Sequence, residues 1–398
     1  MLIIKKILLL ITFLILSYVV FQLIIIRINL KKQFNEELTE NFQEGFSLSS
    51  MFSSDQQSEL INMTSNNKIL IQNMNQTNSN LTIKDFCIKS SYNTAVSGNY
   101  VSTNAINYVI SRGVRYIDFE IFYLDINNLN NNSKSPYFEP VVGFSSDPTF
   151  VQMNTFNVIS LNDALLIVAQ SGFSTTSPNY KDPLIINLRI KSNNQHVYSS
   201  VAKCIDKTIY SKLYVDPNKI IVVSSDLSGS SVTSVTRNIA SKINKNTKIG
   251  DLLGKIIISF DITTFPNYEK SECDKKNVDN NCSYLLSNYI NIENGGSDMT
   301  LSLYNYLSQK PTININKDGS TNIDNIYVAI PDSNYLKKNN INPNYGDWLL
   351  KYGYPIIPYQ FYLNDSTLYD YEKFFNDNKS AFVPLADSIT YFKRYLIN

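Results

Sequence analysis

The chain has 398 residues, of which 43% are hydrophobic and 17% are charged. That length is sufficient for one large domain with additional segments. The 35 lysines and arginines nearly balance the 34 aspartates and glutamates, which gives a net charge of +1. A charge so close to zero carries no electrostatic signature of nucleic-acid binding, so we exclude that class of partner.

The first distinctive segment is the almost wholly apolar run at residues 7–26, ILLLITFLILSYVVFQLIII. A run of about 20 apolar residues is long enough to cross a bilayer as a helix. Its length, and the lack of a small-x-small cleavage pattern, favour an uncleaved N-terminal signal anchor over a cleaved signal peptide. We therefore expect a single-pass membrane protein in contact with bilayer lipids. Basic residues flank the segment on both sides, so the positive-inside rule leaves its orientation open.

Residues 27–80 are polar and rich in Asn, Gln and Ser, which predicts a stalk or loosely ordered spacer. From about residue 81 to residue 398, strand-like and helix-like patterns alternate. Helices are predicted at residues 103–113, 159–173 and 201–214, and strands at 86–88, 114–124, 140–144, 182–190, 219–224, 254–262 and 325–330. Such alternation predicts an α/β fold with a parallel sheet, most simply a (β/α)8 barrel of the TIM type.

A polar stretch at residues 265–322 interrupts this alternation. We interpret it as an insertion or linker between an earlier half at about 81–264 and a later half at about 323–395. Further strand-like and helix-like runs follow in the later half, in GDWLLKYGYPIIPYQFYL and YDYEKFFNDNKSAFVPL.

The cysteines do not indicate a metal site. Cys87, Cys204, Cys273 and Cys282 contain no C-x-x-C pair, and His196 is the only histidine, so a Cys/His zinc site is not expected. Cys273 and Cys282 bracket a polar loop. They are either a disulfide, if the loop faces an oxidising compartment, or two free thiols.

The order of several motifs resembles the catalytic X and Y halves of eukaryotic phosphoinositide-specific phospholipase C. FCIKSSYNTAVSGNYVSTNAINYVISRGVRYIDFEIFY is similar to that family's strand with Ser-Ser-His-Asn-Thr, its helix, and its strand with two carboxylates. PVVGFSS is similar to Val-Tyr-His-Gly, KIGDLLGKIIIS to Leu-x-Gly-Lys-Ile-Leu, and NIYVAIPDSNY to Arg-Ile-Tyr-Pro. The resemblance runs from about residue 81 to about residue 390 and implies the barrel of these phosphodiesterases.

The resemblance also implies where the catalytic groups belong. In that family the inositol 2-hydroxyl attacks phosphorus, two imidazoles move protons, and a calcium ion neutralises developing charge. Here Tyr92 stands at the first histidine position and Phe144 at the second. A phenol is protonated at neutral pH and is a weak base, and phenylalanine has no proton to transfer. His196 lies at a predicted helix start, and we interpret it as a solvated helix-cap or loop histidine.

The calcium ligands are retained only in part. Asn93 occupies the family's asparagine position, and Asp118 and Glu120 match the carboxylate pair with the two acids exchanged. Two residues apart on a strand, these acids face the same side. The alternative is that they are carboxylates bonded to neighbours with no metal role. Arg189 occupies the position of the third acidic ligand, and we expect it to form ion pairs with both acids and fill the site.

Substrate recognition is also altered at the positions implied by the resemblance. Asn325 replaces the arginine that grips a ring phosphate, whereas Tyr327 retains the aromatic residue that stacks on inositol. Ser259 and Asp261 replace two lysines, and an aspartate there would repel a phosphorylated headgroup. Tyr327 is therefore the one substrate-binding candidate.

These replacements predict a membrane-anchored phospholipase C-like protein that is catalytically inactive, has no cofactor, and acts as a binding or scaffold module. A phosphoinositide headgroup is the ligand that the resemblance suggests. The first alternative is a phosphoric diester hydrolase acting on phosphatidylinositol-type lipids. In it, Arg189 replaces calcium and Tyr92 moves protons together with Asp118 or Glu120. Calcium is considered only under that alternative. A second alternative is a structural membrane protein whose barrel supports surface loops.

Overall fold

The computed structural model describes residues 54–64, 68–129, 136–147, 153–225, 233–265, 268, 284–307, 313, 321–332, 335–336 and 341–395. The predicted membrane segment at 7–26, the first half of the predicted stalk, and Cys273 and Cys282 lie outside these ranges. Within them, no helix combines the length and the apolar character needed to span a bilayer. The chain divides into two compact units, and the smaller contributes only parts of residues 125–138 to the described ranges, including α4 (Ile126–Leu129).

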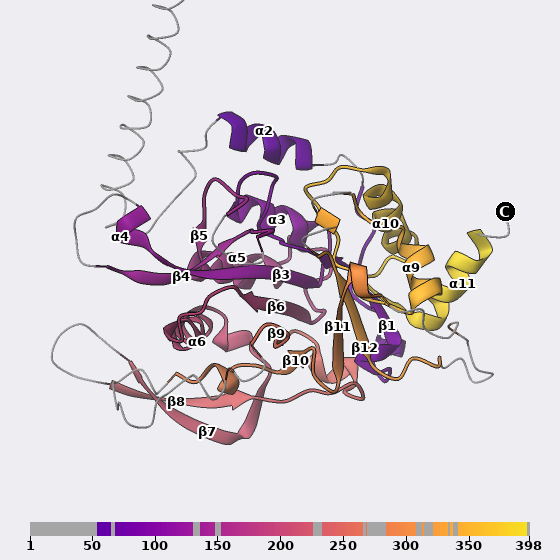
Figure 1. Ribbon diagram of the computed structural model, residues 1–398. Helices are drawn as coiled ribbons and strands as arrows, with labels where there is room; N and C mark the ends of the chain where they lie inside the picture. Colours follow the sequence, from indigo (N-terminus) through magenta and orange to yellow (C-terminus); the bar gives the residue numbers. More distant parts are fainter. Residues whose placement is uncertain are drawn as a thin grey trace, which may run out of the picture. The chain divides into compact units, whose positions relative to one another are not determined.

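The larger unit is organised around a seven-stranded sheet with the order β10-β9-β6-β3-β4-β5, with β2 also paired to β3 (Figure 1). Its strands are β2 (Ser90–Ser91), β3 (Tyr116–Asp125), β4 (Phe138–Gly143), β5 (Ile159–Ser160), β6 (Leu184–Ile190), β9 (Ile256–Asp261) and β10 (Ile292–Asn294). β2, β3, β6, β9 and β10 run parallel to their partners in this group, whereas β4 and β5 pair with each other in antiparallel orientation. Parallel neighbours need crossover connections, and three helices supply them: α3 (Thr103–Ser111), α5 (Leu161–Gly172) and α6 (His196–Thr208).

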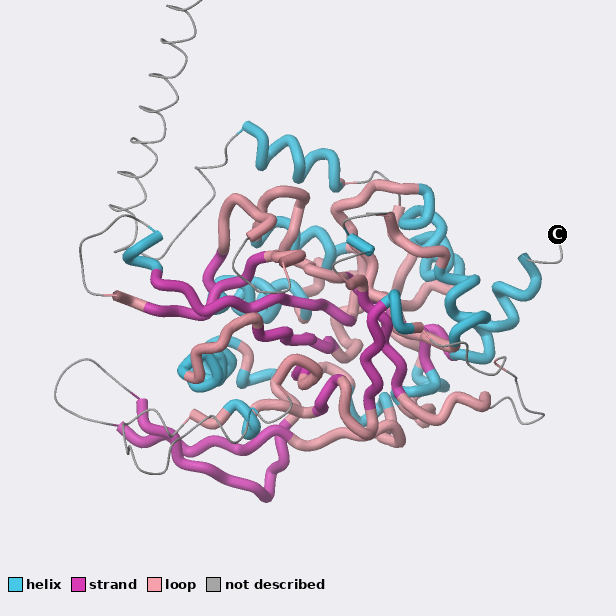
Figure 2. Tube along the Cα trace, in the orientation of Figure 1, coloured by secondary structure: helices cyan, strands magenta, loops and turns pink. Residues whose placement is uncertain are grey.

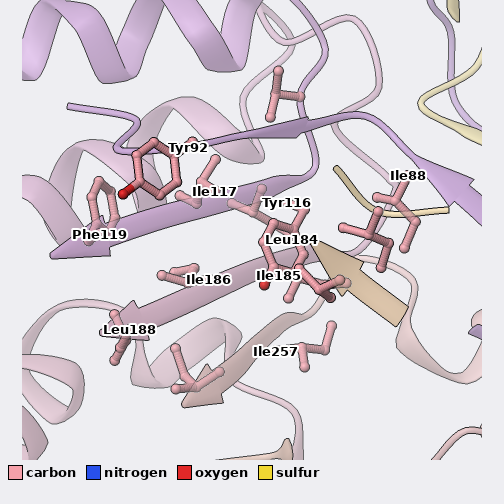
Figure 3. Packing of buried hydrophobic residues seen from close by; sticks show 14 of the residues in the cluster. Ile88, Tyr92, Tyr116, Ile117, Phe119, Leu184, Ile185, Ile186, Leu188 and Ile257 are labelled. Carbon is pink, nitrogen blue, oxygen red and sulfur yellow. The ribbon is translucent and has the colours of Figure 1, made fainter. Parts of the chain in front are cut away.

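Local sequence explains these elements well. All seven residues of β6 are buried, as expected for a continuous apolar run in a parallel sheet. Helix α3 begins at Ser102, whose side chain accepts a hydrogen bond from the Asn104 N–H, and Gly113 follows the helix with a φ of +81°. Figure 3 shows apolar side chains from β3 and β6 packed together in the core.

The structure contains only part of the expected barrel. A separate parallel pair consists of β11 (Met299–Leu303) and β12 (Ile326–Ile330). Single bridges then connect Val328 to Ile356 and Ser91 to Tyr359, which places residues 356–359 beside both β12 and β2. The described strands thus form a mixed α/β structure of several sheets and not one continuous closed barrel (Figure 2).

The strand predicted at residues 219–224 is present, but its place in the parallel sheet is a wrong prediction. It belongs to β7 (Val215–Ser225), which pairs only with β8 (Thr233–Ala240) in a two-stranded antiparallel sheet. Val223 is fully buried, whereas Ile220 and Val222 are each 63% exposed. An apolar run can form either a buried strand or one face of a hairpin, and only packing distinguishes them.

Two polar stretches are more structured than their composition predicts. Residues 284–307, inside the predicted linker, contribute β10 and β11. Residues 68–80, inside the predicted stalk, pack on the larger unit: Ile71 and Met74 are buried, and the Leu70 N–H donates to Asn376 Oδ1 at 3.0 Å. This part of the chain is therefore not a loosely ordered spacer.

The C-terminal elements complete the larger unit. β1 (Phe86–Ile88) pairs antiparallel with β13 (Phe382–Pro384), which brings together segments almost 300 residues apart. The other α-helices among the described residues are α2 (Ser54–Met63), α9 (Tyr345–Tyr352), α10 (Ser366–Asp377) and α11 (Leu385–Tyr395).

Candidate functional site

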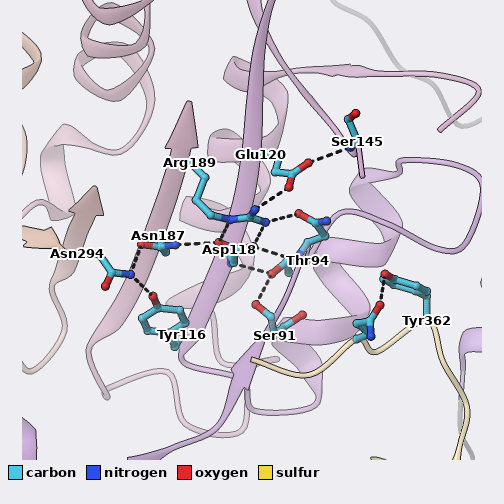
Figure 4. A network of polar contacts seen from close by, with 12 residues as sticks. Ser91, Thr94, Tyr116, Asp118, Glu120, Ser145, Asn187, Arg189, Asn294 and Tyr362 are labelled. Atoms are coloured by element: carbon cyan, nitrogen blue, oxygen red, sulfur yellow. Dashed lines mark hydrogen bonds and ion pairs between the residues drawn. The ribbon is translucent and has the colours of Figure 1, made fainter. Parts of the chain in front are cut away.

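Arg189 lies at the centre of a buried polar cluster (Figure 4). Its Nε donates to Asp118 Oδ1 at 2.8 Å, and its Nη2 donates to Asp118 Oδ2 at 2.6 Å. Its Nη1 donates to Glu120 Oε1 at 2.6 Å, and Nη2 also donates to Asn93 Oδ1 at 2.8 Å. The guanidinium therefore makes four hydrogen bonds, two of which form a bidentate ion pair with Asp118.

The strand register creates this arrangement. Asp118 and Glu120 are two residues apart on β3, so their side chains face the same side of the sheet. Glu120 lies directly opposite Arg189 on the neighbouring strand β6. Asn93 follows β2 in a left-handed conformation, with a φ of +43° that asparagine adopts more readily than most residues. Its backbone N–H donates to Asp118 Oδ2 at 3.1 Å, which fixes its side chain beside the guanidinium.

Neighbouring groups occupy the remaining carboxylate oxygens. Asn187 Nδ2 donates to Asp118 Oδ1 at 2.8 Å, and the Ser145 N–H donates to Glu120 Oε2 at 2.9 Å. Every oxygen of the two acids thus has a donor from the protein. Such saturation is what a buried charge pair requires in order to offset its desolvation.

The cluster is shielded from water, because Arg189, Asp118 and Glu120 are at most 3% exposed. Burial alone would lower the pKa of Arg189, but the negative charges of Asp118 and Glu120 outweigh it and raise that pKa well above its ordinary value. The guanidinium therefore keeps its positive charge at neutral pH.

These residues do not fit a calcium ion. Calcium is held by six to eight oxygen ligands, whereas this site presents a fixed cation at the third acidic position. In the part of the chain that the structure describes, no group of three or more His, Cys, Asp or Glu side chains has an arrangement that could hold a metal.

The two positions expected to carry imidazoles are both buried. The ring centroid of Tyr92 lies 4.6 Å from Arg189 Cζ, a cation–π contact. Burial raises the pKa of the Tyr92 phenol well above its ordinary value, and the positive charge of Arg189 only partly opposes this, so the phenol stays neutral. Phe144, just after β4, is 8% exposed. His196 is the exposed first residue of α6, as expected for a helix-start histidine.

Tyr327, the substrate-binding candidate, and the residues at the other positions where the resemblance implies substrate contacts are bonded within the protein. The Tyr327 hydroxyl donates to Asp324 Oδ1 at 2.5 Å, and Asn325 Nδ2 donates to Ser297 O and to Thr300 Oγ1. Ser259 Oγ donates to Asn187 Oδ1 at 3.1 Å. The Asp261 carboxylate accepts from the backbone N–H and hydroxyl of Thr263, and burial raises its pKa.

Two buried amides that extend the cluster, those of Asn187 and Asn294, were not predicted from the sequence. Asn187 bonds Asp118 and also accepts from Asn294 Nδ2 at 3.1 Å, and Asn294 in turn donates to the Tyr116 hydroxyl at 3.2 Å. One signal was available: Asn187 is a polar residue in the middle of the apolar run LIINLRI. A buried amide in such a position needs partners, and a neighbouring strand must supply them.

No family model matches the chain, and no curated protein matches it. Among solved structures it is similar to PLC21 (phospholipase C) of L. pealei, with 14% identity and a TM-score of 0.48, over 77% of this chain and 37% of that one. It is similar to PLC21 of S. officinalis with 14% identity and a TM-score of 0.46, over 86% of this chain and 45% of that one. The chain spans less than half the length of both, and at this identity the likeness concerns the fold alone.

Proposed function

We propose that this chain is a membrane-anchored phosphoinositide phospholipase C-like protein without catalytic activity, which acts as a binding or scaffold module. The observation that carries the proposal is the position of Arg189. It stands where the sequence resemblance implies an acidic calcium ligand, and it is bonded to all three retained positions, Asn93, Asp118 and Glu120. A cation built into the site excludes calcium by charge repulsion and by volume.

The proton-transfer groups support the same proposal. A general base must accept a proton near the working pH. Tyr92 is a neutral phenol whose pKa is raised by burial, and Phe144 has no titratable group. Loss of a single acid–base group typically costs about 10²–10⁴-fold in rate, so the joint loss of both imidazoles and the metal leaves little catalysis.

The proposal includes a barrel and a membrane anchor. The parallel strands, together with the bridges at Ile356 and Tyr359, support a phospholipase C-like (β/α)8 arrangement. The apolar run at residues 7–26 supports a single-pass anchor. The anchor is tested by alkaline carbonate extraction of membranes: the full chain stays in the pellet, and a chain lacking residues 7–26 is released.

Activity is tested with the full chain reconstituted in vesicles. The substrates are phosphatidylinositol, its phosphorylated forms and an aryl phosphodiester, each with and without calcium, beside an active phospholipase C as positive control. We expect no turnover above the protein-free vesicles. Turnover that is abolished by both Tyr92→Phe and Arg189→Lys overturns the proposal and favours the hydrolase alternative, in which Arg189 replaces the metal.

Binding is measured separately. Calorimetry of the full chain in detergent, titrated with soluble inositol phosphates, distinguishes a headgroup-binding module from a scaffold that binds only protein. Calcium titration of the same sample is expected to show no heat of binding.

A further inference from the structure

The Glu59 carboxylate of helix α2 accepts several hydrogen bonds from one short loop, residues 97–101. Glu59 Oε1 accepts from Asn99 Nδ2 at 2.8 Å and from the Asn99 N–H at 3.1 Å. Its Oε2 accepts from the same N–H at 3.0 Å and from Ser97 Oγ at 3.4 Å. Three different donors, a backbone N–H, an amide and a hydroxyl, thus converge on one carboxylate.

The loop is shaped to receive an anion. Converging donors in a tight turn make an anion-binding concavity, here called the nest, in which the Asn99 backbone N–H is joined by two side-chain donors. Between the two donor residues, Gly98 has a φ of +148°, and a Cβ added there would lie 2.9 Å from both the Glu59 carboxyl carbon and its Oε2. A glycine at this position therefore leaves open the space that the carboxylate occupies.

The nest is held in place independently of α2. The Val101 N–H donates to Asn157 Oδ1 at 2.8 Å, and the Phe156 N–H donates to Asn99 O at 2.8 Å. At the start of the same segment, the Thr94 N–H donates to Asp118 O at 2.9 Å. These bonds anchor the loop on its other side, so its donors keep their geometry when Glu59 leaves.

The attachment of α2 is weak by comparison. Asn99 is exposed, and hydrogen bonds in contact with water contribute little net stability. A hydrogen bond from α2 to this loop, from Gln56 Nε2 to Val101 O, is long at 3.4 Å. Met63 at the end of the helix is buried and provides an apolar anchor.

We propose that Ser97 and Asn99 form an anion-binding site, that Glu59 is its internal occupant, and that α2 is a strap displaced by an external phosphate group. The site lies outside the Arg189 cluster and does not depend on the proposed function of that cluster. The phosphate comes either from a lipid headgroup at the membrane or from a soluble phosphate. Because α2 is the first described element after residues 1–53, its displacement would couple the N-terminal segment to this loop.

The proposal is tested by hydrogen exchange and mass spectrometry on the full chain in detergent. In Glu59→Ala, the Asn99 amide loses its acceptor and is expected to exchange about tenfold faster or more than in the wild type, and the amides of α2 also exchange faster. Inorganic phosphate restores the protection of the Asn99 amide in a saturable manner, while α2 stays fast. Gln57→Ala changes the exposed residue two positions earlier on the same helix and leaves exchange at the wild-type rate.

A second variant and a second phosphate source complete the test. In Gly98→Ala the new methyl group occupies the nest, so exchange accelerates and phosphate does not reverse it. Reversal in Glu59→Ala by both inorganic phosphate and vesicles containing phosphatidic acid supports a general phosphate site. Reversal by those vesicles alone, with phosphatidylcholine vesicles inert, supports a lipid headgroup. Unchanged exchange in Glu59→Ala, or acceleration that neither phosphate source reverses, overturns the proposal.

Discussion

The ring of Tyr92 lies over the guanidinium of Arg189, with the ring centroid 4.6 Å from Cζ. The phenol covers the face of a cation whose edges are bonded to Asp118, Glu120 and Asn93. This relationship gives two residues that are distant in the sequence a shared role in the structure. An arginine in this position needs a low-polarity cover, and an aromatic ring provides that cover together with a favourable electrostatic contact.

Removal of the central cation is expected to destabilise the fold strongly. Arg189→Met leaves two buried carboxylates without their ion pair, and we expect a loss of about 3–5 kcal/mol in the free energy of unfolding. The control is Lys373→Met, which breaks a pair with Asp377 in which the lysine and aspartate side chains are 44% and 36% exposed. That change should cost about 1 kcal/mol or less. Equal losses in urea denaturation would contradict a special role for the buried cluster.

Reversing the charge at the same position is expected to create a calcium site. Arg189→Glu adds an acidic oxygen ligand beside Asn93, Asp118 and Glu120. Three buried acids repel one another, so the variant should be less stable than the wild type without calcium. Calcium should then raise the Tm of the variant. At a calcium concentration of 100 times the Kd, the free energy of unfolding should rise by about 2.7 kcal/mol. Calcium binding by the wild type, or none by the variant, would show that Arg189 does not occupy a metal position.

The contribution of Tyr92 should come from its ring and not from its hydroxyl. Tyr92→Phe keeps the ring above Arg189 and should leave the free energy of unfolding nearly unchanged. Tyr92→Leu removes the cation–π contact and should cost about 0.5–2 kcal/mol. Thermal unfolding of the two variants in parallel decides the point. A loss in Tyr92→Phe as large as that in Tyr92→Leu would assign the role to the hydroxyl.

A second buried cluster predicts a pH dependence of stability. Lys89 Nζ donates to Glu372 Oε1 at 3.3 Å and to Arg112 O at 2.7 Å, and Arg112 forms its own ion pair with Glu372. Burial lowers the pKa of Lys89 from 10.5 to about 8, and the charge of Glu372 only partly opposes this. The unfolded chain therefore binds more protons than the folded protein between pH 8 and pH 10.5.

Stability attributable to Lys89 should accordingly rise with pH across that window, by up to about 3 kcal/mol. The measurement is the difference in unfolding free energy between the wild type and Lys89→Met at pH 7.5, 9 and 10.5. The contributions of the other titrating groups cancel in this difference. A difference that is flat with pH would mean that folding does not lower the pKa of Lys89, and a difference that falls with pH would mean that folding raises it.

Much of the site was predictable because it depends on local geometry. Strand alternation alone places Asp118 and Glu120 on one face, and the ordered motifs place Arg189 on a neighbouring strand. The ion pairs expected from the sequence are present in the structure. The replacements at Tyr92 and Phe144 are likewise facts of sequence, and their chemistry follows from the side chains themselves.

The sequence by itself thus determined the alternation of strands and helices and the identity of the charged groups in the cluster. Only the tertiary structure decided that β7 leaves the parallel sheet, that Asn187 supports Asp118 from below, and that Glu59 binds Asn99. The physical reason is the sequence separation of the residues that interact. Periodicity and residue chemistry report on neighbours within a few positions, whereas these contacts form between segments that only packing of the whole unit brings together.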